Sequence, residues 1–123
     1  MQLVKNCFVL LYAVFIYTVF PQQNRIEYNN QSIFLSGANL AWINFARDIG
    51  IENPNYDTFA DILLQMHDNG GNALRWWLHT DGTVTPEFNS ENFVVSPGNN
   101  TIEQLKNYLD IAWEREVGVI LCL

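Results

Sequence analysis

Basic residues are scarce in this sequence, with six Lys and Arg against 13 Asp and Glu and a formal net charge of −7. Binding to nucleic acid or to an anionic membrane surface needs a basic patch, so this balance argues against both partners. Charged residues make up 15% of the chain, whereas an average domain has about a quarter. Aromatic residues reach 14%, and the excess of Trp and Tyr suits a neutral partner such as a sugar.

Cysteine is also rare, since Cys7 and Cys122 are the only two. Cys7 lies in the apolar N-terminal run, so removal of that run would leave Cys122 alone and exclude an internal disulfide. No Cys or His group has the spacing of a zinc site. Neither a G-x-G-x-x-G turn nor a Walker loop occurs. We therefore expect no structural metal and no cofactor.

Residues 1–20 contain the one long apolar run near the N-terminus. The run is shorter than the roughly 20 residues that a membrane span needs and has the length of a signal-peptide core. We predict a cleaved secretion signal, with an uncleaved signal anchor or a buried N-terminal element as alternatives. A membrane partner is expected only for the anchor, and both the signal and the anchor place the protein outside the cytosol. Residues 21–31 are polar and unperiodic, which indicates a linker or a first edge segment.

The stretch 72–82 indicates a strand that runs into a loop. Strand parity places Leu74, Trp76 and Leu78 on one face. The opposite face carries an arginine, an indole and an imidazole, from Arg75, Trp77 and His79. Such a strand suits the wall of a polar cavity. The alternative is that Arg75 is a structural ion-pair partner and that the tryptophans belong to the core.

Two further apolar runs are predicted to be neighbouring strands in a parallel sheet, at residues 33–42 and 117–123. In the first, Gly37 and Ala38 are small, as needed where backbones or a ligand come close. The second is continuously apolar, which is typical of a parallel strand covered on both faces. A turn with a local Arg47–Asp48 charge pair is expected after the first strand.

Two amphipathic helices separate these strands. Residues 58–69 have Thr58 as the expected cap and a buried stripe of Phe59, Ile62, Leu63 and Met66. The second helix is expected to begin with a capping box of Thr101 and Gln104. Its buried stripe is predicted to comprise Ile102, Leu105, Leu109, Ala112 and Trp113.

The order is therefore strand, helix, strand, helix, strand, which predicts an α/β fold with a parallel sheet. A doubly wound nucleotide-binding sheet would need a glycine-rich turn after the first strand, and that turn is missing. A (β/α)8 barrel places polar, ligand-facing residues at the carboxyl ends of its strands, as Asn39, Trp42 and Arg75 lie here. We predict the N-terminal part of a (β/α)8 TIM barrel, with about two βα units and a third strand.

The long loop at residues 81–100 contains three acidic residues, Asp81, Glu87 and Glu91. Long loops in compact domains are uncommon and often functional. A paired-carboxylate acid/base device is conceivable here. Because nothing fixes the separation of these groups, solvated loop charges are the favoured interpretation.

Two segments carry a family resemblance, FLSGANLAW at residues 34–42 and GGNALRWW at residues 70–77. Together they resemble the opening of a family 5-type glycoside hydrolase, one of the secreted (β/α)8 cellulases and mannanases of the retaining β-glycosidase clan. The resemblance covers residues 32–123, which we predict to be part of a catalytic domain. It implies a β-linked polysaccharide substrate, β-mannan or β-glucan, and a monomeric full-length enzyme.

The resemblance also implies roles for individual residues. Arg75 matches an arginine that hydrogen-bonds the nucleophilic carboxylate and keeps it ionised. Asn39 and Trp42 match first-strand positions near the sugar sites. Strand parity adds Trp77 and His79 as further cleft-facing residues.

The family's two catalytic glutamates have no counterpart in this sequence. The resemblance places the acid/base glutamate at the end of the fourth strand and the nucleophile at the end of the seventh, beyond the predicted elements. We therefore expect an inactive fragment, and expect residues 22–123 alone to be insoluble or molten. The alternatives are a secreted non-catalytic module that binds sugar or protein through Trp42, Trp76 and Trp77, and a small membrane-anchored protein.

Overall fold

The computed structural model describes residues 26–80 and 82–123, in two units, Met1–Phe34 and Leu35–Leu123. The described part of the first unit is an antiparallel hairpin of β1 (Ile26–Tyr28) and β2 (Gln31–Ile33). This hairpin occupies much of the segment expected to be a linker or an edge segment, whereas the predicted signal at residues 1–20 lies outside the described residues. Within the ranges that the structure describes, no helix has the length and apolar character needed to cross a membrane.

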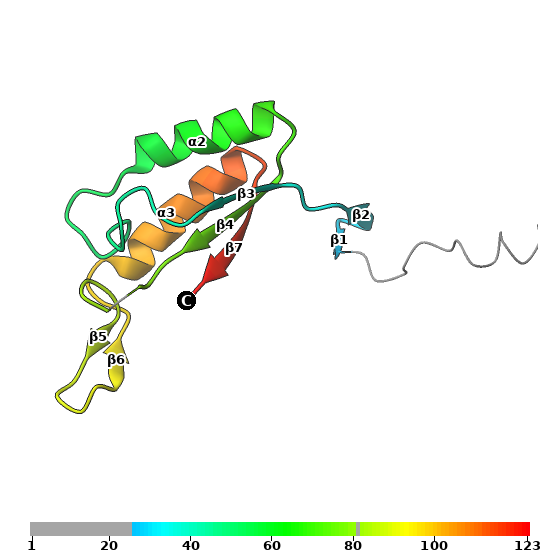
Figure 1. Cartoon of the computed structure of the whole chain (residues 1–123). Coiled ribbons are helices and arrows are strands. Elements are labelled where there is room, and N and C mark those ends of the chain that lie inside the picture. The colour runs from blue at the N-terminus through cyan, green and yellow to red at the C-terminus, as the bar shows by residue number, and fades with distance from the viewer. Residues whose placement is uncertain (1–25, 81) are drawn as a thin grey trace, which may run out of the picture. The chain divides into compact units, whose positions relative to one another are not determined.

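The second unit is built on a parallel sheet with the strand order β3–β4–β7 (Figure 1). Its strands are β3 (Gly37–Leu40), β4 (Ala73–Trp77) and β7 (Gly118–Cys122). Helix α2 (Tyr56–Asp68) connects β3 to β4, and α3 (Thr101–Glu114) precedes β7. The predicted alternation of strands and helices is confirmed.

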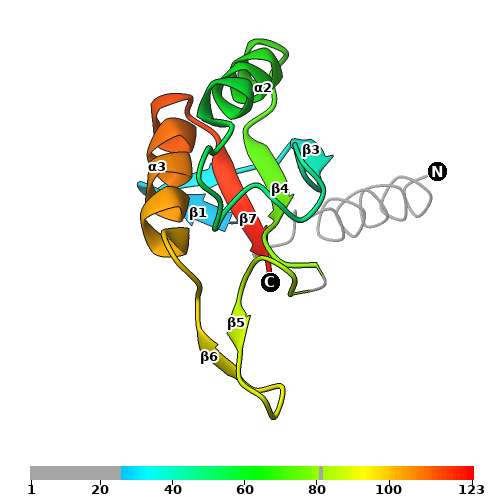
Figure 2. The same cartoon turned by 90° about the vertical axis from the view of Figure 1, so that its left-hand side faces the viewer.

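The loop between β4 and α3 carries a second antiparallel hairpin, which the sequence analysis did not predict. It consists of β5 (Glu87–Phe88) and β6 (Val94–Ser96). Figure 2 shows it extending away from the parallel sheet. The Asn89 side chain accepts hydrogen bonds from the N–H groups of Glu91 and Phe93, both at 3.0 Å, and so fixes the tip of the hairpin.

Both helices cover the same face of the sheet, because both contact the ring of Trp76. The Trp76 ring centroid lies 5.1 Å from that of Phe59 in α2 and 4.8 Å from that of Tyr108 in α3. All three side chains are fully buried. Leu74 and Leu78 join this core, which confirms the apolar face predicted for the central strand.

Close approach of β3 and β4 explains the small residue at position 37. A Cβ atom added to Gly37 would lie only 1.6 Å from the carbonyl oxygen of Ala73. Asn72 also ties the starts of the strands together: its Oδ1 accepts from the Ser36 N–H at 2.8 Å, and its carbonyl accepts from the Gly118 N–H at 2.9 Å.

Helix α2 confirms its predicted stripe but not its predicted start. Phe59 and Leu63 are buried and Ile62 and Met66 are half-buried. The helix begins at Tyr56 rather than after Thr58, and its N-cap Asn55 makes no side-chain capping bond. The prediction was wrong because tertiary contacts of Tyr56, whose ring lies 4.7 Å from that of Tyr108, extend the helix toward its N-terminus.

Helix α3 buries a face that overlaps the predicted one only in part: Ala112 is buried and Leu105 is half-buried against the core, as predicted. Its buried residues are Thr101, Gln104, Tyr108 and Ala112. Ile102 and Trp113, which were expected in the core, are 52% and 71% exposed, and Leu109 is also exposed. Thr101 is the first helical residue rather than the cap, and Asn100 is the N-cap.

The physical reason is that Gln104 and Tyr108 face the segment between β3 and α2 and bond to it. Gln104 Oε1 accepts from the Gly50 N–H at 2.8 Å, and its Nε2 donates to the Ile51 carbonyl at 2.5 Å. Strand β7 likewise departs from its prediction as a fully covered strand. Ile120 is 45% exposed, because it shares the sheet face of Arg75 in the strand register and both helices cover the opposite face.

Candidate functional site at the carboxyl end of the sheet

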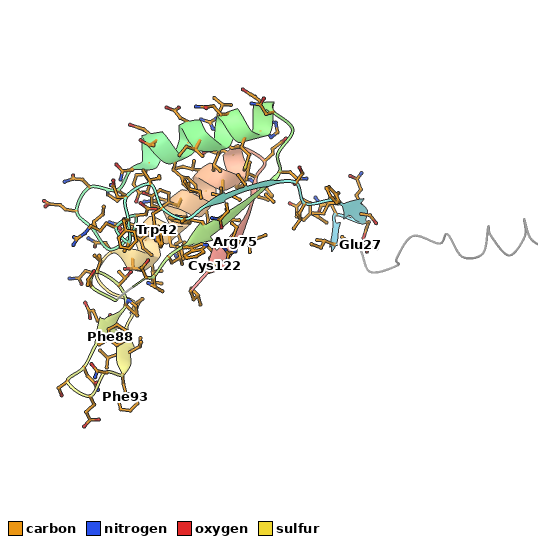
Figure 3. The ribbon with its side chains drawn as sticks, in the orientation of Figure 1. Glu27, Trp42, Arg75, Phe88, Phe93 and Cys122 are labelled. Atoms are coloured by element: carbon orange, nitrogen blue, oxygen red, sulfur yellow. The ribbon has the colours of Figure 1, made fainter. Side chains whose placement is uncertain are left out.

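The candidate site lies on the sheet face opposite the helices. Asn39 pairs with Arg75 and Trp77 with Cys122 in the strand register, so all four residues share this face. Figure 3 shows Trp42, Arg75 and Cys122 near the carboxyl end of the sheet. This end of a parallel α/β sheet is where ligands bind.

Asn39 holds the polar part of the site together. Its Oδ1 accepts a hydrogen bond from Arg75 Nη1 at 2.8 Å and another from Trp77 Nε1 at 3.2 Å. The Arg75 Cζ also lies 4.9 Å from the centroid of the Trp77 ring, a cation–π contact. Because the partner of Arg75 is a neutral amide, the structure does not use this arginine as an ion-pair partner for a carboxylate of the described sheet.

Trp42 and Trp77 form the aromatic part of the site. Their ring centroids lie 5.3 Å apart with the planes at 79°. Phe45 also packs against Trp42, with its ring centroid 4.7 Å from that of Trp42. Both tryptophans are half-buried, so part of each indole remains accessible. Partly exposed rings that are held in place can serve as flat apolar contacts for a ligand.

The structure gives His79 a different environment. Its Nδ1 lies 2.9 Å from Thr85 Oγ1, and Thr85 is buried. This contact ties the segment after β4 to the loop that carries the β5–β6 hairpin. Four predicted site residues (Asn39, Trp42, Arg75 and Trp77) are therefore linked by described contacts, and His79 is linked to the loop instead.

The acidic residues of the long loop do not form a described pair. Glu87 and Glu91 are exposed on the hairpin, in agreement with their interpretation as solvated charges, and Asp81 lies outside the described residues. Across residues 26–80 and 82–123, no group of three His, Cys, Asp or Glu side chains is placed to hold a metal ion.

Asp48 is the functional candidate that the sequence analysis missed. Only 3% of this residue is exposed. Its Oδ2 accepts from the Ile43 N–H at 2.9 Å and from Trp76 Nε1 at 3.1 Å, and its Oδ1 accepts from the Asn44 N–H at 2.8 Å. The expected pairing with Arg47 is wrong as an account of this carboxylate, because three N–H donors surround it. No local signal reveals this role, since Trp76 is 28 residues away in the sequence.

Tyr108 continues this buried network into α3. Its hydroxyl donates to the Asp48 carbonyl at 3.2 Å and accepts from the Asn55 N–H at 2.9 Å. Burial, which disfavours the charged phenolate, is the largest cause that raises the pKa of Tyr108 to about 12.

Trp76 is excluded from any sugar-contacting role in this fold. Its side chain is fully buried between the two helices and its indole N–H is bonded to Asp48. The prediction that Trp76 could bind sugar together with Trp42 and Trp77 is therefore wrong, because strand alternation sends it to the opposite face.

No family model matches the chain. The chain is 38% identical over 100 residues to a mannan endo-1,4-beta-mannosidase of Mytilus edulis, a match that covers 80% of this chain and 27% of the relative. It is 36% identical over 100 residues to the mannan endo-1,4-beta-mannosidase of Cryptopygus antarcticus, covering 78% of this chain and 26% of the relative.

Solved structures give the same result. The beta-mannanase from the blue mussel Mytilus edulis matches with a TM-score of 0.72 and 40% identity, over 77% of this chain and 28% of that one. The beta-1,4-mannanase of the sea hare Aplysia kurodai matches with a TM-score of 0.76 and 34% identity, over 85% and 31%. The chain resembles part of a glycoside hydrolase family 5-like barrel, as predicted.

These matches also confirm the predicted fold. The elements β3, α2, β4, α3 and β7 are two βα units and a third strand of a (β/α)8 barrel. The chain spans 26–27% of the length of the curated relatives that it matches.

Proposed function

We propose that this chain is the N-terminal part of a secreted retaining glycoside hydrolase that cleaves β-linked polysaccharide, with β-mannan as the preferred substrate over β-glucan. The observation that carries the proposal is the cluster of Asn39, Arg75 and Trp77 at the carboxyl end of the sheet, in a chain similar to mannan endo-1,4-beta-mannosidases.

Arg75 is proposed to orient a catalytic carboxylate. A guanidinium has five N–H donors in a rigid fork, and the bond to Asn39 Oδ1 uses one of its nitrogens, Nη1. The exposed remainder of the guanidinium can hold a carboxylate by charge-assisted hydrogen bonds. A nearby cation favours the ionised form of that carboxylate, which is the form a nucleophile needs.

Trp42 and Trp77 are proposed to contact the sugar rings. Their edge-to-face packing fixes the angle between the two indoles, and an indole offers an apolar surface of low conformational entropy to a neutral ligand. Trp77 is held by its bond to Asn39, which also leaves the amide NH2 of Asn39 to donate to a sugar hydroxyl. His79 is proposed to support the loop that borders this surface through Thr85.

The 123 residues alone are proposed to be inactive. Retaining hydrolysis needs two carboxyl groups about 5–5.5 Å apart across the scissile bond. Asp48 is buried on the helix side of the sheet among N–H donors, and Glu87 and Glu91 lie on the hairpin. Both catalytic glutamates are therefore proposed to come from later strands of a longer polypeptide.

Residues 1–20 are proposed to direct secretion, and the full-length enzyme is proposed to act as a monomer on an extracellular polysaccharide. Expression of the natural N-terminus in a secretory host, followed by N-terminal sequencing of the secreted product, checks the first point. A mature protein that begins near Gln22 supports a cleaved signal, and one that retains residues 1–20 supports the anchor.

The deciding experiment is to read the genomic DNA beyond the codon for Leu123 and to assay the complete gene product on β-mannan and on cellulose. We expect an open frame that supplies an Asn-Glu pair at one strand end and a later strand-end Glu, with activity on mannan. Activity is also compared between Arg75→Ala, which removes the guanidinium, and Arg75→Lys as its matched control. The lysine keeps the positive charge but loses the planar arrangement of N–H donors. A complete gene product that binds mannan oligosaccharides without cleaving them would contradict the proposed enzyme and support a non-catalytic sugar-binding module instead.

A further inference from the structure

We propose that Asp48 is a positioning residue for the sugar-binding surface: its buried carboxylate holds Trp42 beside Trp77. The inference rests on the proposed function, because it assumes that these two indoles contact substrate. Asp48 itself lies on the helix side of the sheet, bonded to the Trp76 indole, and is too buried to offer a contact to a ligand.

A single oxygen atom links the backbone directly after Trp42 to the side chain of Trp76, the residue before Trp77. Asp48 Oδ2 accepts from the Ile43 N–H at 2.9 Å, which belongs to the peptide bond directly after Trp42. The same oxygen accepts from Trp76 Nε1 at 3.1 Å, and Trp76 directly precedes Trp77 in β4. The position of Trp42 relative to Trp77 is therefore tied to one atom of a buried side chain.

The second oxygen closes the loop that follows Trp42. Asp48 Oδ1 accepts from the Asn44 N–H at 2.8 Å, and the Arg47 N–H donates to the Asn44 carbonyl at 2.9 Å. These bonds fix the turn on which Phe45 contacts the Trp42 ring. The Tyr108 hydroxyl donates to the main-chain carbonyl of Asp48 and to neither carboxylate oxygen, so its loss leaves the three carboxylate bonds in place.

The chemistry of the three donors explains why a carboxylate occupies this position. All three groups around the side chain are N–H donors, and a carboxylate accepts at both oxygens without donating. An asparagine of the same shape would turn an NH2 group toward at least one of these donors. A buried donor that loses its partner costs about 1–3 kcal/mol, and in this site that cost would fall on the loop that carries Trp42.

Three variants of the complete gene product test the proposal. Asp48→Asn disturbs the carboxylate bonds, and Trp76→Phe removes one donor. Tyr108→Phe removes the two hydrogen bonds of the Tyr108 hydroxyl but leaves the carboxylate untouched. The readouts are KM and kcat on mannan oligosaccharides, the unfolding midpoint, and hydrogen exchange at the Ile43 and Asn44 amides.

For Asp48→Asn we expect KM to rise about tenfold with kcat within about threefold, since a lost buried bond corresponds to roughly that change. Exchange at the Ile43 and Asn44 amides should accelerate by about tenfold or more. Trp76→Phe should raise KM less, and Tyr108→Phe should lower the midpoint without changing KM or the exchange of these two amides. Asp48→Glu, which keeps both acceptors one methylene further out, replaces Asp48→Asn if the latter does not fold, and should also raise KM and amide exchange.

The proposal is overturned if the Asp48 variant that folds lowers the midpoint as Tyr108→Phe does but leaves KM and both amides unchanged, because Asp48 would then be purely structural. An unmutated gene product that does not cleave mannan defeats the proposed function instead. In that case the amide exchange still decides whether Asp48 fixes the Trp42 loop.

Discussion

The two faces of strand β4 differ in what their side chains contact. On one face Leu74 and Trp76 are fully buried against α2 and α3. On the other, Arg75 is exposed and Trp77 is half-buried, and both bond to Asn39 of the neighbouring strand. The buried face stabilises the fold, and the open face presents hydrogen-bond donors and an indole. Substitutions one residue apart in the chain should therefore have effects of different kinds.

The largest expected effect is on stability, at the buried face. Trp76→Ala removes the ring that contacts both Phe59 and Tyr108, and truncation of a buried Trp or Phe costs about 3–5 kcal/mol. Denaturant unfolding of the complete gene product measures it. Trp113→Ala is the matched indole truncation, because Trp113 is exposed in the described structure. A large loss of stability in Trp113→Ala and none in Trp76→Ala would contradict the assignment of the buried face to fold stability.

The next effect is on activity, at the open face. Arg75→Ala should lower kcat/KM by about a hundredfold or more, since truncating one partner of a hydrogen-bonded charge pair costs about 2–5 kcal/mol. The unfolding midpoint should change little, because the guanidinium is exposed. Arg75→Lys should recover only part of the rate, as it keeps the charge without the fork. Equal losses of activity and stability in Arg75→Ala would contradict the assignment of this face to substrate.

A third effect is a pH dependence of the buried face. Tyr108 has its pKa raised from 10.0 to about 12 by burial, so between these values the folded protein keeps a proton that the unfolded chain has lost. The contribution of Tyr108 to the free energy of unfolding should therefore be constant below pH 10. It should fall by about 1.4 kcal/mol per pH unit as pH rises toward 12. Urea unfolding of the complete gene product and of Tyr108→Phe at pH 9 and pH 11.5 measures the difference, and the variant should lack this slope. Parallel slopes would mean that Tyr108 is not held in its protonated form.

The sequence predicts those parts of the structure that depend on local periodicity. The alternation from Leu74 to Trp77 and the stripe of Phe59 and Leu63 follow from one element each, and both are confirmed. The predicted buried face of α3 was wrong for Ile102, Leu109 and Trp113, because that helix has apolar residues on two sides. Its orientation is set by Gln104, which bonds to Ile51 at a separation of 53 residues.

The candidate site shows the same limit. Asn39, Arg75 and Trp77 were predicted from strand parity and the family resemblance, and they lie together on the open face. Asp48 was missed because one of its donors, the Trp76 indole, lies 28 residues away on strand β4, and only the folded chain brings it to the loop of Asp48. The face of a residue can be predicted from its neighbours in sequence, but the partners of a buried polar group cannot.

The smallest expected effect separates two properties of a single residue on the open face. Trp77→Phe keeps an aromatic ring but removes the Nε1 donor to Asn39 Oδ1, a neutral hydrogen bond with a net value of about 1 kcal/mol. KM for mannan oligosaccharides should rise about fivefold, because Asn39 and the ring lose their mutual alignment, and stability should change by less than for Trp76→Phe. Trp77→Ala, which removes the ring as well, should raise KM further. If the two variants have the same KM, the hydrogen bond rather than the aromatic surface accounts for the contribution of Trp77. Trp77 would then contribute to substrate recognition through its N–H group, and the aromatic contact would be left to Trp42.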